Sequence, residues 1–177
     1  MSVRVPSTGL VMCVRTNGEA GEWIRFGASL IHEDDLVNHV AVLHHQDETG
    51  RWWGIEGRPG GVGWVDATSY IESQYTISNE REVISSDVRL KVANTMAGLL
   101  GVPYDWRAIG EDAVRDLHLP DLWAEKWKGL VAPGHVVCSS AAAVAYRDSK
   151  LPYPSNVDIA HVQPADWADF LIQNHYD

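Results

Sequence analysis

Residues 133–147, PGHVVCSSAAAVAYR, form a short apolar run that ends at Cys138 and continues into an alanine-rich segment typical of a helix. A cysteine in the first turn of a helix lies among unpaired backbone N–H groups, at the positive end of the helix dipole. Both effects favour the thiolate, which is the reactive form of cysteine. The alternative is that Cys138 is a small buried apolar side chain, as most free cysteines are.

A cysteine nucleophile needs a base, and the histidine candidates come early in the chain. Residues 38–44, NHVAVLH, alternate and are rich in β-branched residues, which predicts a strand that begins at His39. Residues 46–50 predict a hairpin turn, and residues 51–56 predict the returning strand. Adjacent strands lie about 5 Å apart, so Glu56 could fix the tautomer and orientation of the His39 ring. The alternative is that both are ordinary residues at strand ends.

The order of the motifs along the chain resembles a known family. A strand with Asn-His-Val precedes a strand that ends in Glu-Gly, a Gly-Val segment, a Pro-Tyr-Asp-Trp motif and a Val-Cys-Ser helix start. This order is similar to the circularly permuted branch of the NlpC/P60 papain-like superfamily, which includes YiiX-like and lecithin:retinol acyltransferase-like proteins. The resemblance extends from about residue 9 to residue 170, and it opens with the segments 9–14 and 23–27.

The resemblance implies an α+β, papain-like fold in permuted order, with an antiparallel sheet packed against helices and the nucleophile at a helix N-terminus. By position, Cys138 matches the nucleophile, His39 the general base and Glu56 the polar residue that orients the base. Tyr104 matches the tyrosine placed near the nucleophile, where its hydroxyl is a candidate second oxyanion donor beside the backbone N–H of Cys138.

The third position varies between branches of the family. Asn38, Asp35 and a backbone carbonyl therefore remain alternatives to Glu56 as the group that orients His39.

Three classes of function follow. The favoured one is a cysteine hydrolase, an amidase or peptidase, that cleaves an amide bond in cell-wall peptide or a similar substrate through a thioester. The second is a thiol acyltransferase or esterase acting on lipid, which the acidic composition and the lack of a C-terminal apolar anchor disfavour. The third is a non-catalytic structural module of a larger assembly, such as a phage tail.

Composition agrees with one globular domain that spans residues 1–177. The chain is 45% hydrophobic and 21% charged, as is ordinary for a folded domain. Its net charge of −10, without a cluster of Lys and Arg, argues against a nucleic-acid partner and against docking on anionic lipid.

No targeting segment is predicted. The N-terminus lacks the apolar stretch of a secretory signal, and no apolar run approaches membrane-spanning length. Two cysteines make no disulfide framework, and Cys13, inside an apolar strand, is expected to be structural. We therefore expect a protein that is cytoplasmic as synthesised, with association with a virion or release on lysis left open.

No metal site or cofactor is expected. His44 and His45 are adjacent on a predicted strand, so they should point to opposite faces. The sequence contains no HExxH and no paired CxxC motif. The glycine-rich segment 57–63 has neither the Walker lysine nor GxGxxG spacing, and it is expected to be a flexible turn. Helices are predicted at residues 88–100 after a cap at 85–87, and at 108–117, 122–127 and 164–171.

Overall fold

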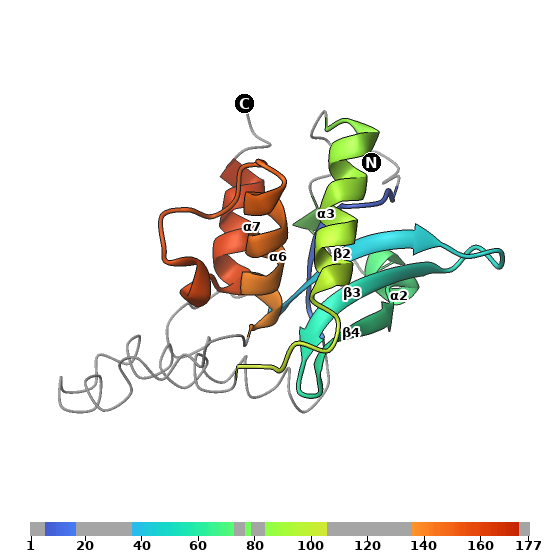
Figure 1. Ribbon diagram of the computed structural model, residues 1–177, viewed down its shortest axis with the longest axis horizontal. Helices are drawn as coiled ribbons and strands as arrows, with labels where there is room; N and C mark the ends of the chain where they lie inside the picture. The colour runs from blue at the N-terminus through green and yellow to red at the C-terminus, as the bar shows by residue number, and fades with distance from the viewer. Residues whose placement is uncertain (1–5, 17–36, 73–76, 79–83, 106–135, 174–177) are drawn as a thin grey trace.

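A computed structural model describes residues 6–16, 37–72, 77–78, 84–105 and 136–173 of the chain. Its strands are β1 (Val11–Val14), β2 (His39–Gln46), β3 (Trp52–Arg58), β4 (Gly61–Asp66) and β5 (Ile77–Ser78). Its helices are α2 (Thr68–Glu72), α3 (Ser86–Gly98), α6 (Cys138–Asp148), the 3-10 helix η1 (Ile159–His161) and α7 (Pro164–Gln173). The architecture is therefore α+β, as predicted (Figure 1).

The strands form one sheet in the order β4-β3-β2-β1-β5, and each neighbouring pair is antiparallel. The strands predicted at 39–44 and 51–56 are both present, as β2 and β3. The turn between them is held by the carboxylate of Asp47, which accepts hydrogen bonds from the backbone N–H groups of Thr49 and Arg51. A tight hairpin of this kind fixes the register of β2 against β3.

The glycine-rich segment 57–63 is mostly strand, so the prediction of a flexible turn was wrong. β3 continues to Arg58 and β4 begins at Gly61, with only residues 59–60 between them. Gly61 has φ +105°, a conformation that glycine adopts without strain. The glycines thus allow a tight turn and a close backbone approach within regular structure.

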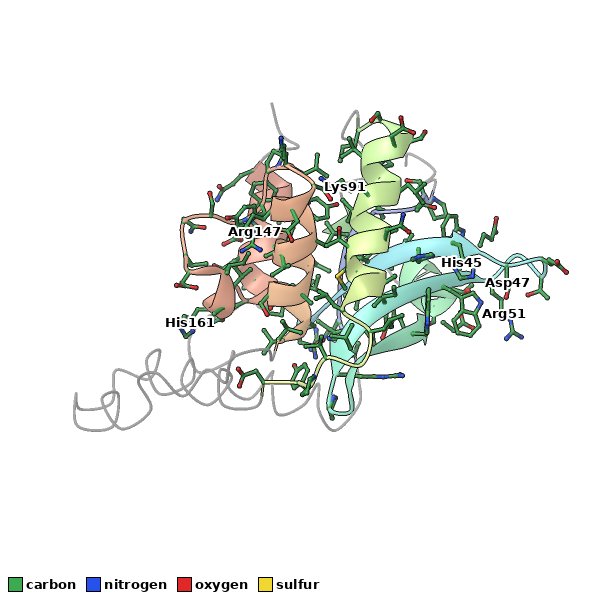
Figure 2. The ribbon with its side chains drawn as sticks, viewed as in Figure 1. His45, Asp47, Arg51, Lys91, Arg147 and His161 are labelled. Atoms are coloured by element: carbon green, nitrogen blue, oxygen red, sulfur yellow. The ribbon has the colours of Figure 1, made fainter. Side chains whose placement is uncertain are left out.

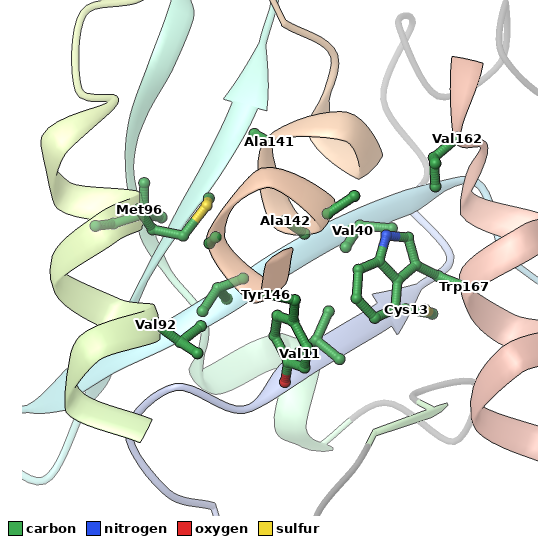
Figure 3. Packing of buried hydrophobic residues seen from close by; sticks show 14 of the residues in the cluster. Val11, Cys13, Val40, Val92, Met96, Ala141, Ala142, Tyr146, Val162 and Trp167 are labelled. Carbon is green, nitrogen blue, oxygen red and sulfur yellow. The ribbon is translucent and has the colours of Figure 1, made fainter. Parts of the chain in front are cut away.

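Helices cover both faces of the sheet. On one face α3, α6 and α7 pack on β1, β2 and β3, and the core between them consists of buried apolar side chains (Figures 1 and 3). Labelled members of this core are Val11, Cys13 and Val40 from the sheet, Val92 and Met96 from α3, Ala141, Ala142 and Tyr146 from α6, Trp167 from α7, and Val162 from the segment before α7. On the other face, Tyr70 and Ile71 of α2 pack against a smaller cluster that includes Met12 and Leu43.

Small side chains let α6 approach the sheet closely. Its buried positions include four alanines with no exposed surface: Ala141, Ala142, Ala143 and Ala145. Two buried polar groups fix the helix in place, because the Tyr146 hydroxyl donates to the carbonyl of Gly9 at 3.1 Å and the Trp167 indole N–H donates to the carbonyl of Ser139 at 3.0 Å. The position of the first residue of α6 is therefore set by packing along the whole helix.

The other predicted elements have mixed outcomes. The helix predicted at 88–100 is α3, whose cap Ser85 accepts from the N–H of Val88, and the helix at 164–171 is α7. The segments 23–27, 108–117 and 122–127 lie outside the described residues. Within the described residues, no helix is long and apolar enough to cross a membrane.

Gly57 marks the closest contact between β3 and α6, and it gives a test of that contact. A Cβ at this position would lie 2.9 Å from the backbone N and 3.0 Å from the Cα of Cys138. We expect Gly57→Ala to lower the free energy of unfolding by about 1–3 kcal/mol, because the backbone of α6 must shift. Denaturant titration of both proteins measures the change.

Gly60→Ala is the matched control in the adjoining turn, where a new Cβ meets no atom within 4 Å. Its free energy of unfolding should stay within about 0.5 kcal/mol of the wild type. Equal losses in the two variants would show that the contact at Gly57 is not tight.

Candidate active site

His39 and Glu56 meet where β2 begins and β3 nears its end. Glu56 is paired with Ala41, and His39 lies two residues earlier on the same side of β2, which makes His39 and Glu56 diagonal neighbours. The Nε2 atom of His39 lies 2.8 Å from the Oε2 atom of Glu56. Their exposed fractions are 8% and 6%, so this contact is largely shielded from water. A carboxylate there accepts the N–H of Nε2, which leaves Nδ1 as the ring nitrogen available to another partner.

Cys138 is the first residue of α6, and its exposed fraction is 2%. Burial opposes ionisation of its thiol, but the charge of His39, a hydrogen bond with the His39 ring and the backbone N–H of Val40 outweigh burial. Together they lower the pKa of Cys138 below its usual value of 9.0, although the charge of Glu56 acts in the opposite direction. Cys138 and His39 are thus joined directly, and the thiolate is favoured.

The pKa of His39 is shifted in the complementary direction. Burial alone would lower it, but the charge of Cys138, hydrogen bonds with Cys138 and Glu56, and the charge of Glu56 raise the pKa of His39 to about 10. Both shifts therefore favour the charged forms, a thiolate on Cys138 and an imidazolium on His39.

Tyr104 reaches Cys138 from a neighbouring segment. A parallel bridge joins Tyr104 to Val136, two residues before the cysteine. Burial, the charge of Cys138 and a hydrogen bond with the Cys138 side chain raise the pKa of Tyr104 well above its usual value. The phenol therefore stays protonated, and its hydroxyl is the donor toward the sulfur.

The structure brings together all four residues singled out in the sequence, and it also shows that Asn38, one of the alternatives to Glu56, is engaged elsewhere. The side-chain amide of Asn38 is bonded to Thr16, with Oδ1 accepting from its backbone N–H at 2.8 Å and Nδ2 donating to its carbonyl at 3.0 Å. That amide closes the end of β1 against β2, one residue before His39. Asp35 lies outside the described residues. Cys13 is fully buried in β1, and burial raises its pKa strongly.

Sequence reasoning missed Tyr70. Its hydroxyl donates to Oε2 of Glu56 at 3.1 Å, and its ring lies edge-on to that of His39 with 6.4 Å between centroids. No local motif marks it, since Tyr70 follows Glu56 by 14 residues and belongs to a different element.

The expectation for His44 and His45 was also wrong. The pairing of β2 with β3 shifts between Leu43 and His45, and this irregularity places the two Nδ1 atoms 3.1 Å apart. Both rings contact the indole of Trp64 on β4. Figure 2 labels His45 and, nearby in the turn between β2 and β3, Asp47. Two imidazoles so close could share an ion, but the described residues contain no group of three or more His, Cys, Asp or Glu side chains that could hold a metal.

Comparison with known proteins shows the fold. No family model matches the chain, and no curated protein matches it in sequence. Among solved structures, it is similar to the metalloprotein YiiX from Escherichia coli O157:H7, with a TM-score of 0.52 and 16% sequence identity. The match covers 81% of this chain and 66% of the YiiX chain, just under two thirds of that protein. The chain thus shares the YiiX fold, whereas the described residues do not provide the three or more ligands of an ordinary protein metal site.

The two cysteines should differ sharply in reactivity toward iodoacetamide. The lowered pKa of Cys138 keeps its thiolate populated below pH 9.0, whereas burial holds Cys13 as a thiol. At pH 7 we expect Cys138 to be alkylated at least about tenfold faster than Cys13. On lowering the pH from 9 to 7, its rate should fall far less than the roughly 25-fold expected of an ordinary thiol with a pKa of about 8.5. Peptide mapping by mass spectrometry gives both rates.

His39→Ala supplies the control, because it removes the charge and the hydrogen bond that lower the pKa of Cys138. Labelling of Cys138 at pH 7 should then slow, while labelling of both cysteines in denaturant stays equal. Equal native rates for Cys13 and Cys138 would contradict an activated thiolate.

Proposed function

We propose that this protein is a cysteine hydrolase that cleaves an amide bond through a thioester intermediate, and that it belongs to the permuted NlpC/P60 group of papain-like proteins. One observation carries the proposal. A buried series of side chains runs from Glu56 through His39 to Cys138, with the Tyr104 hydroxyl on the sulfur. In this reading Glu56 orients the base, His39 is the base and Cys138 is the nucleophile.

The first half of the reaction forms the thioester. The Cys138 thiolate attacks the carbonyl carbon of the amide, and a C–S bond forms as the carbonyl electrons move to oxygen. The backbone N–H of Cys138, at the start of α6, and the Tyr104 hydroxyl are the donors that we assign to that oxyanion. His39 then passes its proton to the amide nitrogen, the C–N bond breaks, and the amine leaves.

The second half regenerates the enzyme. Neutral His39 takes a proton from water, and the hydroxyl attacks the thioester carbon. The second tetrahedral intermediate collapses, the C–S bond breaks, and the acid leaves with Cys138 as thiolate and His39 as imidazolium. Glu56 favours the charged ring in both halves because its carboxylate accepts from Nε2 throughout.

The substrate class that we propose is a peptide, with cell-wall peptide as the first candidate. The similarity of motif order to cell-wall amidases and peptidases supports this choice, and the acidic composition speaks against an anionic lipid surface. Incubation with muropeptides, peptide anilides and lipid esters, each followed by intact-mass analysis, separates the alternatives. Hydrolysis products or an acyl adduct on Cys138 with peptide substrates support the proposal, products or adducts from lipid esters alone favour the acyltransferase, and neither product nor adduct from any of them favours a structural module.

Removal of the reacting groups should abolish turnover while the fold remains. Cys138→Ala removes only a sulfur atom, so we expect no detectable hydrolysis and an unchanged circular dichroism spectrum. His39→Ala should lower kcat by about 100-fold or more, as expected for loss of a general acid and base. Hydrolysis that survives in Cys138→Ala would place the nucleophile elsewhere.

Glu56→Gln tests the third member through the pH profile. Activity needs a thiolate and an imidazolium, so the rate should rise as Cys138 loses its proton and fall as His39 loses its own near pH 10. Because Glu56 raises the pKa of His39, its replacement by an amide should move the alkaline limb to lower pH and reduce kcat without abolishing it. An unchanged profile in Glu56→Ala would remove Glu56 from the mechanism.

A further inference from the structure

We propose that Tyr70 is a positioning residue for the His39–Glu56 pair, acting from the opposite face of the sheet to α6. The inference rests on the proposed function, since it assigns a fifth side chain to the same site. A single carboxylate oxygen carries the argument: Oε2 of Glu56 accepts from Nε2 of His39 at 2.8 Å and from the Tyr70 hydroxyl at 3.1 Å.

Two donors on one oxygen restrict how the carboxylate can turn. A carboxylate held only by His39 could rotate about its side-chain bonds and present either oxygen, whereas a second donor from another element fixes one oxygen in place. The Tyr70 ring packs edge-on to the His39 ring, so the same residue also limits movement of the imidazole. Tyr70 therefore restricts both partners of the hydrogen bond.

Tyr70 can do this because α2 is fixed to the sheet. The backbone N–H of Ala67 donates to the carbonyl of Trp52 at 2.8 Å, and the backbone N–H of Trp52 donates to Oγ1 of Thr68 at 3.1 Å. The carboxylate of Asp66 accepts from the backbone N–H of Thr68. The first two bonds tie the start of α2 to Trp52, the first residue of β3, which is the strand that carries Glu56.

The phenol keeps its proton in this place. Burial, the charge of Glu56 and the hydrogen bond to Glu56 raise the pKa of Tyr70 well above its usual value, against a smaller opposing effect of Arg58. Tyr70 is thus a permanent donor. Among the described residues, Arg58 of β3, Cys138 of α6 and Tyr104 also act electrostatically on this cluster.

The test measures the pKa of His39 directly, without any substrate. In a Cys138→Ser background, where the thiolate no longer acts on the ring, nuclear magnetic resonance of ¹⁵N-labelled histidine follows the His39 titration, assigned by comparison with His39→Ala. If Tyr70 orients the Glu56 carboxylate toward His39, Tyr70→Phe lowers the pKa of His39, and Glu56→Gln lowers it further. An unchanged pKa in Tyr70→Phe overturns the inference, and so does a raised pKa, which would show that Tyr70 only withdraws charge from Glu56.

Tyr146→Phe is the matched control. It removes a buried hydroxyl that also donates one 3.1 Å hydrogen bond, to the carbonyl of Gly9, but it lies in the helix core away from Glu56. It should leave the His39 pKa unchanged, and an equal shift in both variants would indicate a general effect of destabilisation and overturn the assignment.

Turnover gives a second readout in the Cys138 protein. Tyr70→Phe should lower kcat about two- to tenfold, the range that corresponds to one ordinary hydrogen bond, with KM unchanged. Loss through KM alone would overturn the positioning role. Failure of the proposed function appears separately, as turnover that survives Cys138→Ala, because the His39 titration does not depend on turnover.

Discussion

The contact between the end of β3 and the start of α6 determines where everything else in the site lies. The backbone of Gly57 is so close to the backbone of Cys138 that no side chain fits between them. Glu56 immediately precedes this glycine, so the residue that binds His39 and the residue that meets the cysteine are consecutive. The alanines of α6 make the approach possible, since larger side chains would hold the helix away from the sheet.

The contact between β3 and α6 also brings the ionisable side chains of the site close enough to compensate one another's charge. A buried thiolate, imidazolium and carboxylate would each be costly alone, because transfer of a charge from water into the protein interior is strongly unfavourable. Here each charge has partners of opposite sign or a donor: the sulfur has His39, Val40 N–H and Tyr104, and the carboxylate has His39 and Tyr70. Removal of one partner would leave the others with less compensation, so we expect a change in any member to affect the whole cluster.

Local patterns were enough to predict the elements that carry the site. The alternation after Asn38, the turn at Asp47 and the alanines after Cys138 each act over a few residues, and they gave β2, β3 and α6. The pairing of His39 with Glu56 followed because antiparallel strands joined by a short turn have few registers. The prediction that Cys138 lies beside His39, about 100 residues earlier, came from the resemblance in motif order. No local rule predicts that the start of a distant helix lies against a strand.

Predictions failed where a local irregularity interrupts the alternation of a strand, and where a residue contacts a partner that is distant in the sequence. An irregularity in strand pairing after Leu43 overrides the alternation that should have separated His44 from His45, and the sequence there carries no glycine or proline to mark it. The glycines of segment 57–63 indicated flexibility, yet the backbone of Gly57 has no positive φ. A glycine is needed there because the backbone of Cys138 leaves no room for a Cβ atom. Tyr70 illustrates the remote case, because its contact with Glu56 exists only after β4 has returned along β3 and α2 has folded back on the sheet. The role of Tyr70 can be inferred only from the carboxylate oxygen of Glu56 that it shares with His39. This contact requires β2, β3 and α2 to be in place together, so no pattern within one segment of the sequence predicts it.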